Sequence, residues 1–394
     1  MRLTIEKDEI ISRQEAIKEE TIKRGKQAFL SFSAVTVFYL TGFHFIPTER
    51  PAALVIPVEG PSFIFLPKLE IEHAQLALVE EIITYPEYPG DQHPMEKLAQ
   101  TIKEWGLQKS SFLAEGGSYG SSMGYRGPAL KDILPEIDLE IDPDPVEEMR
   151  MIKTPAELDL IRESARWGNL AHVLLQEYCA PGKTENEVSM RASQEATLAM
   201  MKTLGPAYKP LGQAGARAGF RGQIGKNSAL PHAVNINAVM KEGDNLVTGA
   251  AAGVGGYTSE LERTMFLGKP SPEQRRYYGY MMEMMEVAFD AIQPGRPCSD
   301  VDQAVRKIYD KYDLWETWRH HTGHALGILG HEAPFFDTGD QTIMKPGMVF
   351  SIEPGIYLPE VGGFRHSDTV FVTERGMEFL TYYPRELEDM IIPV

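Results

Sequence analysis

The sequence has little cysteine, no long apolar run and a shortage of positive charge, and each of these excludes a class of protein. Cys179 and Cys298 are its two cysteines, so a disulfide framework is excluded and a reducing compartment is expected. Because no stretch of about 18 residues is apolar, no membrane span is predicted. Lysine and arginine total 39 against 56 acidic residues, and the formal net charge of -17 argues against nucleic-acid binding.

The first residues and the overall composition are typical of a cytoplasmic globular protein. Residues 1–10 alternate charged and apolar side chains and lack the apolar segment of a signal peptide. The 394 residues, 43% hydrophobic and 24% charged, are enough for two or three domains with a large core. We therefore predict a cytoplasmic location and no contact with a membrane.

Residues 1–145 are predicted to form the smaller of two domains, of mixed α/β type. The apolar, β-branched run at 28–40 indicates a strand. Two further apolar runs, 53–58 and 62–66, flank a Gly-Pro turn and predict a hairpin.

The second domain is predicted to span 150–394 and to begin with a long helix. Residues 142–145, with two prolines and two acids, are predicted to link it to the first domain. Thr154 fits an N-cap, Pro155 fits the first helical position, and Glu157 is the third residue after the cap.

The second domain also contains an internal repeat of a capped helix followed by a glycine-rich hairpin. The first copy covers 181–188 and 243–260, and the second covers 294–302 and 347–367. Two such halves imply a pseudo-twofold domain with an active site between them.

Candidate functional residues gather in the second domain. Five of the ten histidines lie in the range from His320 to His366. Glu353 lies in the same range, within an apolar strand pattern. A carboxylate there is costly to bury unless it meets a partner or a ligand. Because His324 and His331 share the segment with Glu353, a functional role is favoured over that of a core histidine.

Glu260 and Glu262 form a second cluster. On a strand they point to the same face and repel each other unless a cation lies between them. That cation is a metal ion, the neighbourhood of Arg263 or a positively charged substrate.

Several short motifs in the second domain together resemble one known family. They are Arg150-Met-Ile-Lys153 with Glu157, Pro231-His232, Gly256-Tyr257, Gly323-His324 through Pro334, and Gly347 through Gly355. The sequence is similar in these motifs to the pita-bread domain of Xaa-Pro dipeptidases, aminopeptidase P and creatinase. The resemblance implies an α/β (α+β) fold, with a pita-bread domain after a creatinase-type N-terminal domain.

The resemblance also implies a damaged metal site. The family's peptidases hold two metal ions with two Asp, one His and two Glu. The matching positions here are Gly249 (or Thr248), Glu260, His324, Glu353 and Ser367. Because too few carboxylates remain for two divalent ions, we predict that no metal cofactor is used. The alternative is a single divalent ion at Glu260, His324 and Glu353.

Creatinase, the family member that works without metal, has the same Glu-Arg-Thr sequence as Glu262-Arg263-Thr264 here. The resemblance implies that His232 shuttles a proton, while Glu262 and Glu353 orient a cationic group or activate water. It also implies that Arg50 helps to bind a substrate carboxylate. Because Ser367 replaces a histidine of creatinase, a substrate other than creatine is expected.

Further residues complete the predicted site. His324 and His331 are expected to line the pocket and bind the developing anion. Arg365 is expected to bind a carboxylate bidentately, and Tyr257 to contact the substrate. The loop at 205–226, with six glycines, is either a mobile lid or a surface excursion.

The predicted function is metal-independent hydrolysis of a C–N bond in a small carboxylate-bearing substrate. One alternative is an Xaa-Pro dipeptidase or aminopeptidase that uses one metal ion. Another is a catalytically inactive protein that keeps the pocket for binding. The expected partner is a small molecule or dipeptide substrate, and the resemblance implies a homodimer.

Overall fold

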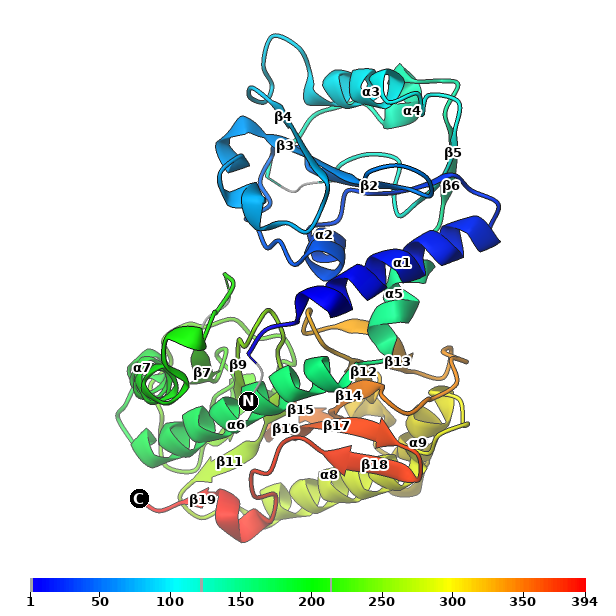
Figure 1. The fold of residues 1–394 in the computed structure, drawn as a ribbon. Coiled ribbons are helices and arrows are strands. Elements are labelled where there is room, and N and C mark those ends of the chain that lie inside the picture. The colour runs from blue at the N-terminus through cyan, green and yellow to red at the C-terminus, as the bar shows by residue number, and fades with distance from the viewer. Residues whose placement is uncertain (1–2, 121–122, 213–214) are drawn as a thin grey trace. The chain divides into compact units, whose positions relative to one another are not determined.

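A computed structural model describes residues 3–120, 123–212 and 215–394 (Figure 1). The chain divides into two compact units, Ile5–Met149 and Arg150–Val394, and residues 3 and 4 belong to the second. Within the described ranges, no helix is long and apolar enough to cross a membrane.

The N-terminal unit is built on a six-stranded mixed sheet with the strand order β4-β3-β2-β1-β5-β6. Its strands are β1 (Ala28–Ser31), β2 (Ala53–Pro57), β3 (Phe63–Pro67), β4 (Glu81–Tyr85), β5 (Ser111–Ala114) and β6 (Asp138–Ile141). Its helices are α1 (Lys7–Lys23), α2 (Ala34–Thr41), α3 (Pro94–Glu104) and α4 (Leu130–Ile133). The predicted hairpin is confirmed, because β2 and β3 pair antiparallel.

Two predictions for the N-terminal half are wrong in part. The strand predicted at 28–40 ends at Ser31, and the chain then enters α2, where the Ser33 side chain accepts a hydrogen bond from the Thr36 amide. Residues 36–41 are all buried, and a segment buried on every side has no periodicity that separates helix from strand. The predicted linker is also partly helical, because α5 (Asp144–Met151) begins within it.

The C-terminal unit combines two pairs of helices with a large antiparallel sheet. The helices are α6 (Pro155–Tyr178), α7 (Glu185–Leu204), α8 (Pro272–Ala291) and α9 (Ser299–Tyr312). The eight-stranded sheet has the order β13-β12-β14-β17-β10-β9-β7, with β18 paired to β17. Its strands are β7 (Ala216–Gly219), β9 (Gly249–Ala252), β10 (Leu261–Glu262), β12 (Gly323–Ala325), β13 (Glu332–Phe336), β14 (Val349–Ile352), β17 (Ser367–Thr373) and β18 (Gly376–Phe379). Smaller sheets contain β8 (Asn245–Val247), β11 (Thr264–Leu267) and β19 (Ile391–Ile392), and β15 (Gly355–Leu358) with β16 (Gly362–Arg365).

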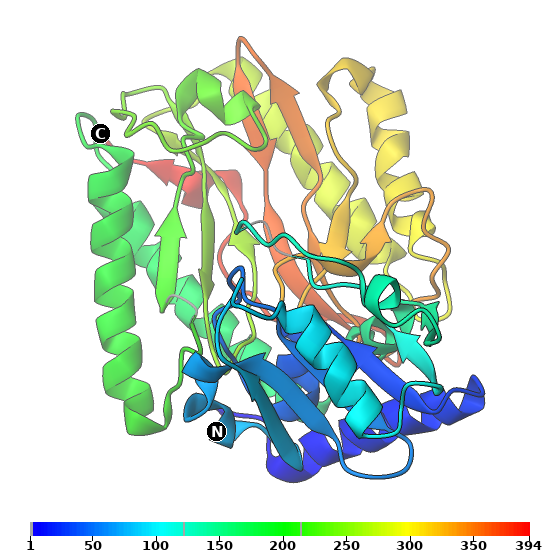
Figure 2. The ribbon, with the colours of Figure 1, turned by 90° about the horizontal axis from the view of Figure 1, so that it is seen from above.

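The predicted internal repeat is confirmed as two halves, each a pair of packed helices with antiparallel strands. α6 packs on α7, and α8 packs on α9. Figure 2 shows the green helices of the first half and the yellow helices of the second on either side of the strands. The halves join where β10 pairs antiparallel with β17. The start of α6 is as predicted, because Thr154 and Glu157 form a capping box.

The glycine-rich loop at 205–226 is not a free lid along its whole length. Its middle forms β7, which pairs antiparallel with β9 over four residues and so belongs to the large sheet. Residues 213 and 214 lie outside the described residues. The segment after β7 carries Arg221, whose Nη2 donates to the Glu262 carboxylate.

A buried histidine ties α6 to the strands that carry the site. His172 is fully buried, and its Nε2 lies 2.7 Å from the Thr248 hydroxyl oxygen. That hydroxyl already donates to the Arg263 carbonyl, so the imidazole is the donor in this contact. Burial, followed by the charge of Arg263, lowers the pKa of His172 to about 3.

We predict that His172 makes the protein sensitive to acid. The unfolded chain protonates this imidazole below a pH of about 6.5, whereas the folded chain keeps it neutral down to a pH of about 3. The stability that His172 contributes is therefore full above the unfolded pKa and falls by about 1.4 kcal/mol per pH unit between those limits.

The measurement is chemical unfolding of the wild type and of His172→Gln from pH 7 to pH 4. Glutamine keeps a hydrogen-bond donor but does not titrate. The difference in unfolding free energy should shrink as the pH falls, and a difference independent of pH would contradict the prediction.

Candidate active site

The candidate site lies on one face of the large sheet, at the seam between the halves. In an antiparallel pair, opposed residues share a face, and so do alternate residues along each strand. Glu262 is opposed to Ser367 across the seam, and His324 is opposed to Ser351. The polar side chains that this pairing brings together are Glu260, Glu262, His324, Ser351, Glu353 and Ser367.

His324 is the buried centre of this cluster. Its Nδ1 lies 3.0 Å from the Ala325 carbonyl oxygen and donates to it, so Nε2 carries the lone pair in the neutral ring. Nε2 lies 3.3 Å from a Glu353 oxygen and 4.0 Å from a Glu260 oxygen. It makes no hydrogen bond to any described residue. The His331 ring stacks on His324 with centroids 3.7 Å apart.

Opposite charges keep His324 and Glu353 ionised. Burial would lower the pKa of His324, but the carboxylates of Glu353 and Glu260 outweigh burial and raise it to about 9. Burial would raise the pKa of Glu353, but His324 and Arg365 lower it below its usual range. At neutral pH these two side chains therefore form an ion pair.

Glu260 is held by serines. The hydroxyls of Ser351 and Ser367 both donate to its Oε1, at 2.5 and 2.9 Å. Ser367 occupies a predicted ligand position, and its hydroxyl orients a carboxylate instead of supplying one. Gly249, at the other altered position, has no side chain, and a Cβ added there would lie 3.5 Å from Glu262 Oε1.

Glu262 is bound by two arginines. Arg365 donates from Nε to one carboxylate oxygen and from Nη2, at 2.9 Å, to the other. Arg221 Nη2 donates to Oε1 at 2.9 Å. These arginines supply the cation expected beside the paired glutamates, whereas Arg263 instead pairs with Asp368 at 2.9 Å. The predicted role of Glu262 in orienting a cationic substrate is not supported by this geometry.

Arg365 has no N–H group left for a substrate carboxylate. The N–H groups not used by the glutamate donate to Pro231 and Gln223, both at 3.3 Å, and to the Tyr357 hydroxyl at 3.0 Å. Every donor has an acceptor here, so this geometry does not favour the predicted bidentate contact with substrate, which stays a prediction. Arg365 instead fixes the backbone next to His232.

One cavity, of about 490 Å³, shares Glu353 with this cluster. It is lined by Pro231, His232, Arg319, His320, His321, His331, Glu353 and Arg365. His232 and His331 are exposed on it. His320 is half-buried, and its Nε2 lies 2.7 Å from the Tyr357 hydroxyl. His320, His321 and Arg319 were not predicted as site residues, because the sequence does not show which of the clustered side chains faces the cavity.

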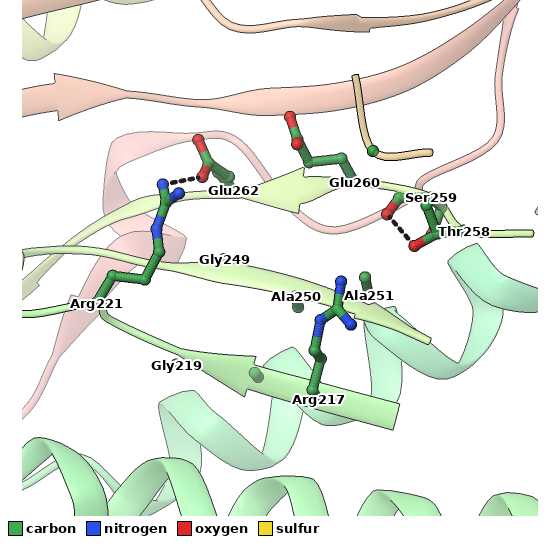
Figure 3. A pocket seen from close by; sticks show the side chains of 12 residues that line it. Arg217, Gly219, Arg221, Gly249, Ala250, Ala251, Thr258, Ser259, Glu260 and Glu262 are labelled. Carbon is green, nitrogen blue, oxygen red and sulfur yellow. Dashed lines mark hydrogen bonds and ion pairs between the residues drawn. The ribbon is translucent and has the colours of Figure 1, made fainter. Parts of the chain in front are cut away.

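A second cavity, of about 310 Å³, is bordered by Glu260 and Glu262. In Figure 3, a dashed line joins Arg221 to Glu262, whereas Arg217 extends from β7 and has no dashed line to either carboxylate. Arg221 comes from the segment predicted to be either a mobile lid or a surface excursion. Neither arginine was predicted, because their positions depend on the path of the chain after β7.

Glu185 holds two site segments together and was also missed. It is fully buried at the start of α7. Its Oε1 accepts hydrogen bonds from the amides of Ile236 and Ala238, both at 2.9 Å, and its Oε2 accepts from the Gly222 amide at 2.7 Å. One carboxylate thereby joins the segment after His232 to the segment that carries Arg221.

Two predicted substrate contacts lie elsewhere. Tyr257 is buried and donates to Glu157 at 2.7 Å, and it lines neither cavity described above. Arg50 lies in the N-terminal unit, where it pairs with Glu49 and Glu87. The role of Arg50 stays a prediction.

The cluster fits a single cation. Ligand atoms of Glu260, His324 and His331 lie within 4.8 Å of one another, and so do those of Glu260, Glu262 and Glu353. Because Glu262 is bound by arginines, Glu260, His324, His331 and Glu353 remain as candidate ligands. Once Nε2 of His324 gives up its proton, this imidazole and the two carboxylates beside it form a donor set suited to an ion such as Zn²⁺ or Mn²⁺.

Comparison with known proteins agrees with this fold. The model of metallopeptidase family M24 matches residues 159–374, and that of the creatinase/prolidase N-terminal domain matches residues 13–152. The chain therefore belongs to metallopeptidase family M24, and the pita-bread resemblance is confirmed. It is a hydrolase that acts on C–N bonds.

Individual relatives match over nearly the whole chain. An Xaa-Pro dipeptidase of Pyrococcus furiosus is 34% identical over 90% of this chain and 92% of its own length. The structure of dipeptidase PepE from Mycobacterium ulcerans has a TM-score of 0.81 and 27% identity, over 99% of this chain and 100% of that one. A prolidase from Thermococcus sibiricus has a TM-score of 0.81 and 28% identity, over 97% and 98%.

We predict that Glu185→Gln loosens both segments that Glu185 holds. A glutamine side chain has one oxygen and an NH₂ group in place of the second oxygen. At least one of the backbone N–H groups that now donate to Glu185 would therefore lose its acceptor. Hydrogen exchange of the Gly222, Ile236 and Ala238 amides should accelerate, and activity should fall. Glu187→Gln, on the exposed side of α7, is the matched control. Unchanged protection of all three amides would contradict the role assigned to Glu185.

Proposed function

We propose that the chain is a dipeptidase that cleaves Xaa-Pro bonds with one divalent cation held by Glu260, His324 and Glu353. The observation that carries the proposal is the buried Nε2 of His324, which lies between two carboxylates without a hydrogen bond among the described residues. The relatives named Xaa-Pro dipeptidase and prolidase support the substrate class.

A second cation lacks ligands. Gly249 and Ser367 offer no carboxylate, and Glu262 is neutralised by Arg365 and Arg221. Two divalent ions would bring four positive charges to this site. Glu260 and Glu353, the two carboxylates here that accept no hydrogen bond from a described arginine, carry two negative charges. One ion, at which His324 must give up its proton, balances the charge.

The residues around the cation position divide the work of hydrolysis. A bound divalent cation would polarise the peptide carbonyl and lower the pKa of a water molecule. His232, exposed on the larger cavity, protonates the leaving nitrogen. Arg319 lines the same cavity, and its Nε and Nη2 donate to no described residue, so it is suited to the carboxylate of a dipeptide.

Metal-free hydrolysis through His232, as in creatinase, is the second candidate. It is favoured by the charged His324–Glu353 pair, which balances Glu353 without a metal ion. The relatives with peptidase names favour the first candidate and do not support a binding protein without activity. From the sequence alone, we further propose a cytoplasmic homodimer.

We predict that the purified chain binds one Mn²⁺ ion in calorimetry and loses Xaa-Pro hydrolysis in a chelator. Glu353→Gln should weaken Mn²⁺ binding at least about tenfold, because even a partner of a metal ligand contributes that much. Glu374→Gln, at an exposed turn, is the matched control. Two bound ions would contradict the single site, and full activity in chelator would favour the metal-free candidate.

We predict that His232→Ala lowers kcat about 100-fold or more while Mn²⁺ binding is retained. A positioned general acid contributes about this factor, and His232 is not a ligand. The variant should melt at the wild-type temperature, because the side chain is exposed. Wild-type kcat in His232→Ala would remove this residue from the proton transfer.

A further inference from the structure

The smaller cavity beside Glu260 has no part in the hydrolysis described above. Its lining includes Arg217, Arg221, Gly249, Thr258, Ser259 and Glu260. Gly249 contributes no side chain, and Gly219, Ala250, Ala251 and Gly330 are small, so the space is left to the two arginines and the hydroxyls (Figure 3). Because Glu260 borders both this cavity and the cation position, a group bound here would lie next to the cation position.

Both arginines have N–H groups to spare. Arg217 is exposed on β7, and its side chain makes no hydrogen bond or ion pair with any residue in the described ranges. Arg221 uses Nη2 alone, toward Glu262 and Gln223, so Nε and Nη1 remain unused among the described residues. Glu262 holds the Arg221 guanidinium in place before a ligand binds. Less side-chain entropy is therefore lost when Arg221 binds a ligand.

Arg217 carries a positive charge that no described carboxylate pairs with. Arg221 and Arg365 both bind Glu262, whereas Arg217 makes no ion pair with any residue in the described ranges. An anionic group is the ligand suited to such a guanidinium.

We propose that Arg217 and Arg221 form a subsite for a carboxylate on the substrate side chain, so that the enzyme prefers dipeptides with glutamate or aspartate at the amino end. This inference rests on the proposed dipeptidase function. Guanidinium groups bind carboxylates with two parallel charge-assisted hydrogen bonds, and a neutral amide of the same shape cannot replace them.

The test compares Glu-Pro with Gln-Pro, which differ in charge but hardly in shape. The wild type should cleave Glu-Pro with a kcat/KM about tenfold or more above that for Gln-Pro, the factor expected for a hydrogen bond to a charged group. Arg217→Gln should bring the ratio close to one. Arg191→Gln, an exposed arginine on α7, is the matched control and should keep the wild-type ratio.

Binding separates this inference from the proposed function. If neither peptide is cleaved, the dipeptidase proposal fails, and calorimetric binding of the same two peptides still tests the subsite. Tighter binding of Glu-Pro that is lost in Arg217→Gln would support it. Equal affinity for both peptides, or a preference that survives in Arg217→Gln, would overturn it.

Discussion

The site depends on one buried ion pair, between Arg263 and Asp368. Arg263 is fully buried, and its five N–H groups donate to the Asp368 carboxylate and to the carbonyl oxygens of Glu262, Ser367, Tyr383 and Pro384. Glu262 and Ser367 face each other across the seam between the two halves. A slip of one residue would turn both side chains away from the site, and loss of one partner of a buried pair costs about 3–5 kcal/mol.

On the face that this seam fixes, arginines supply positive charge beside the acidic side chains. Arg221 and Arg365 neutralise Glu262, and Ser367 turns its hydroxyl to Glu260. The remaining carboxylates and His324 suit one divalent ion. Gly249, which has no side chain, leaves room for the cavity that Arg217 lines. The arginine contacts of Glu262 and the proposed substrate preference thus both depend on the side chains beside this seam.

The two halves of the C-terminal unit could be predicted from the sequence, and so could the placement of His324 and Glu353 in one site. Both predictions rest on capped helices and short motifs, which are local features of a sequence. The sequence did not identify Glu185 or Arg221, whose partners lie far along the chain and meet them only in the folded sheet. It also did not show that Arg365 binds Glu262, because the acceptors of an arginine cannot be identified from a sequence. Residues 28–40 were assigned to one strand because complete burial removes periodicity.

The most direct test of the single-cation account is anomalous diffraction from crystals soaked in Mn²⁺, which locates each ion independently of activity. The account predicts one anomalous peak in the C-terminal unit, within coordination distance of Glu260, His324 and Glu353. Two peaks, with one of them next to Gly249, or no peak in this cluster at saturating Mn²⁺, would contradict it.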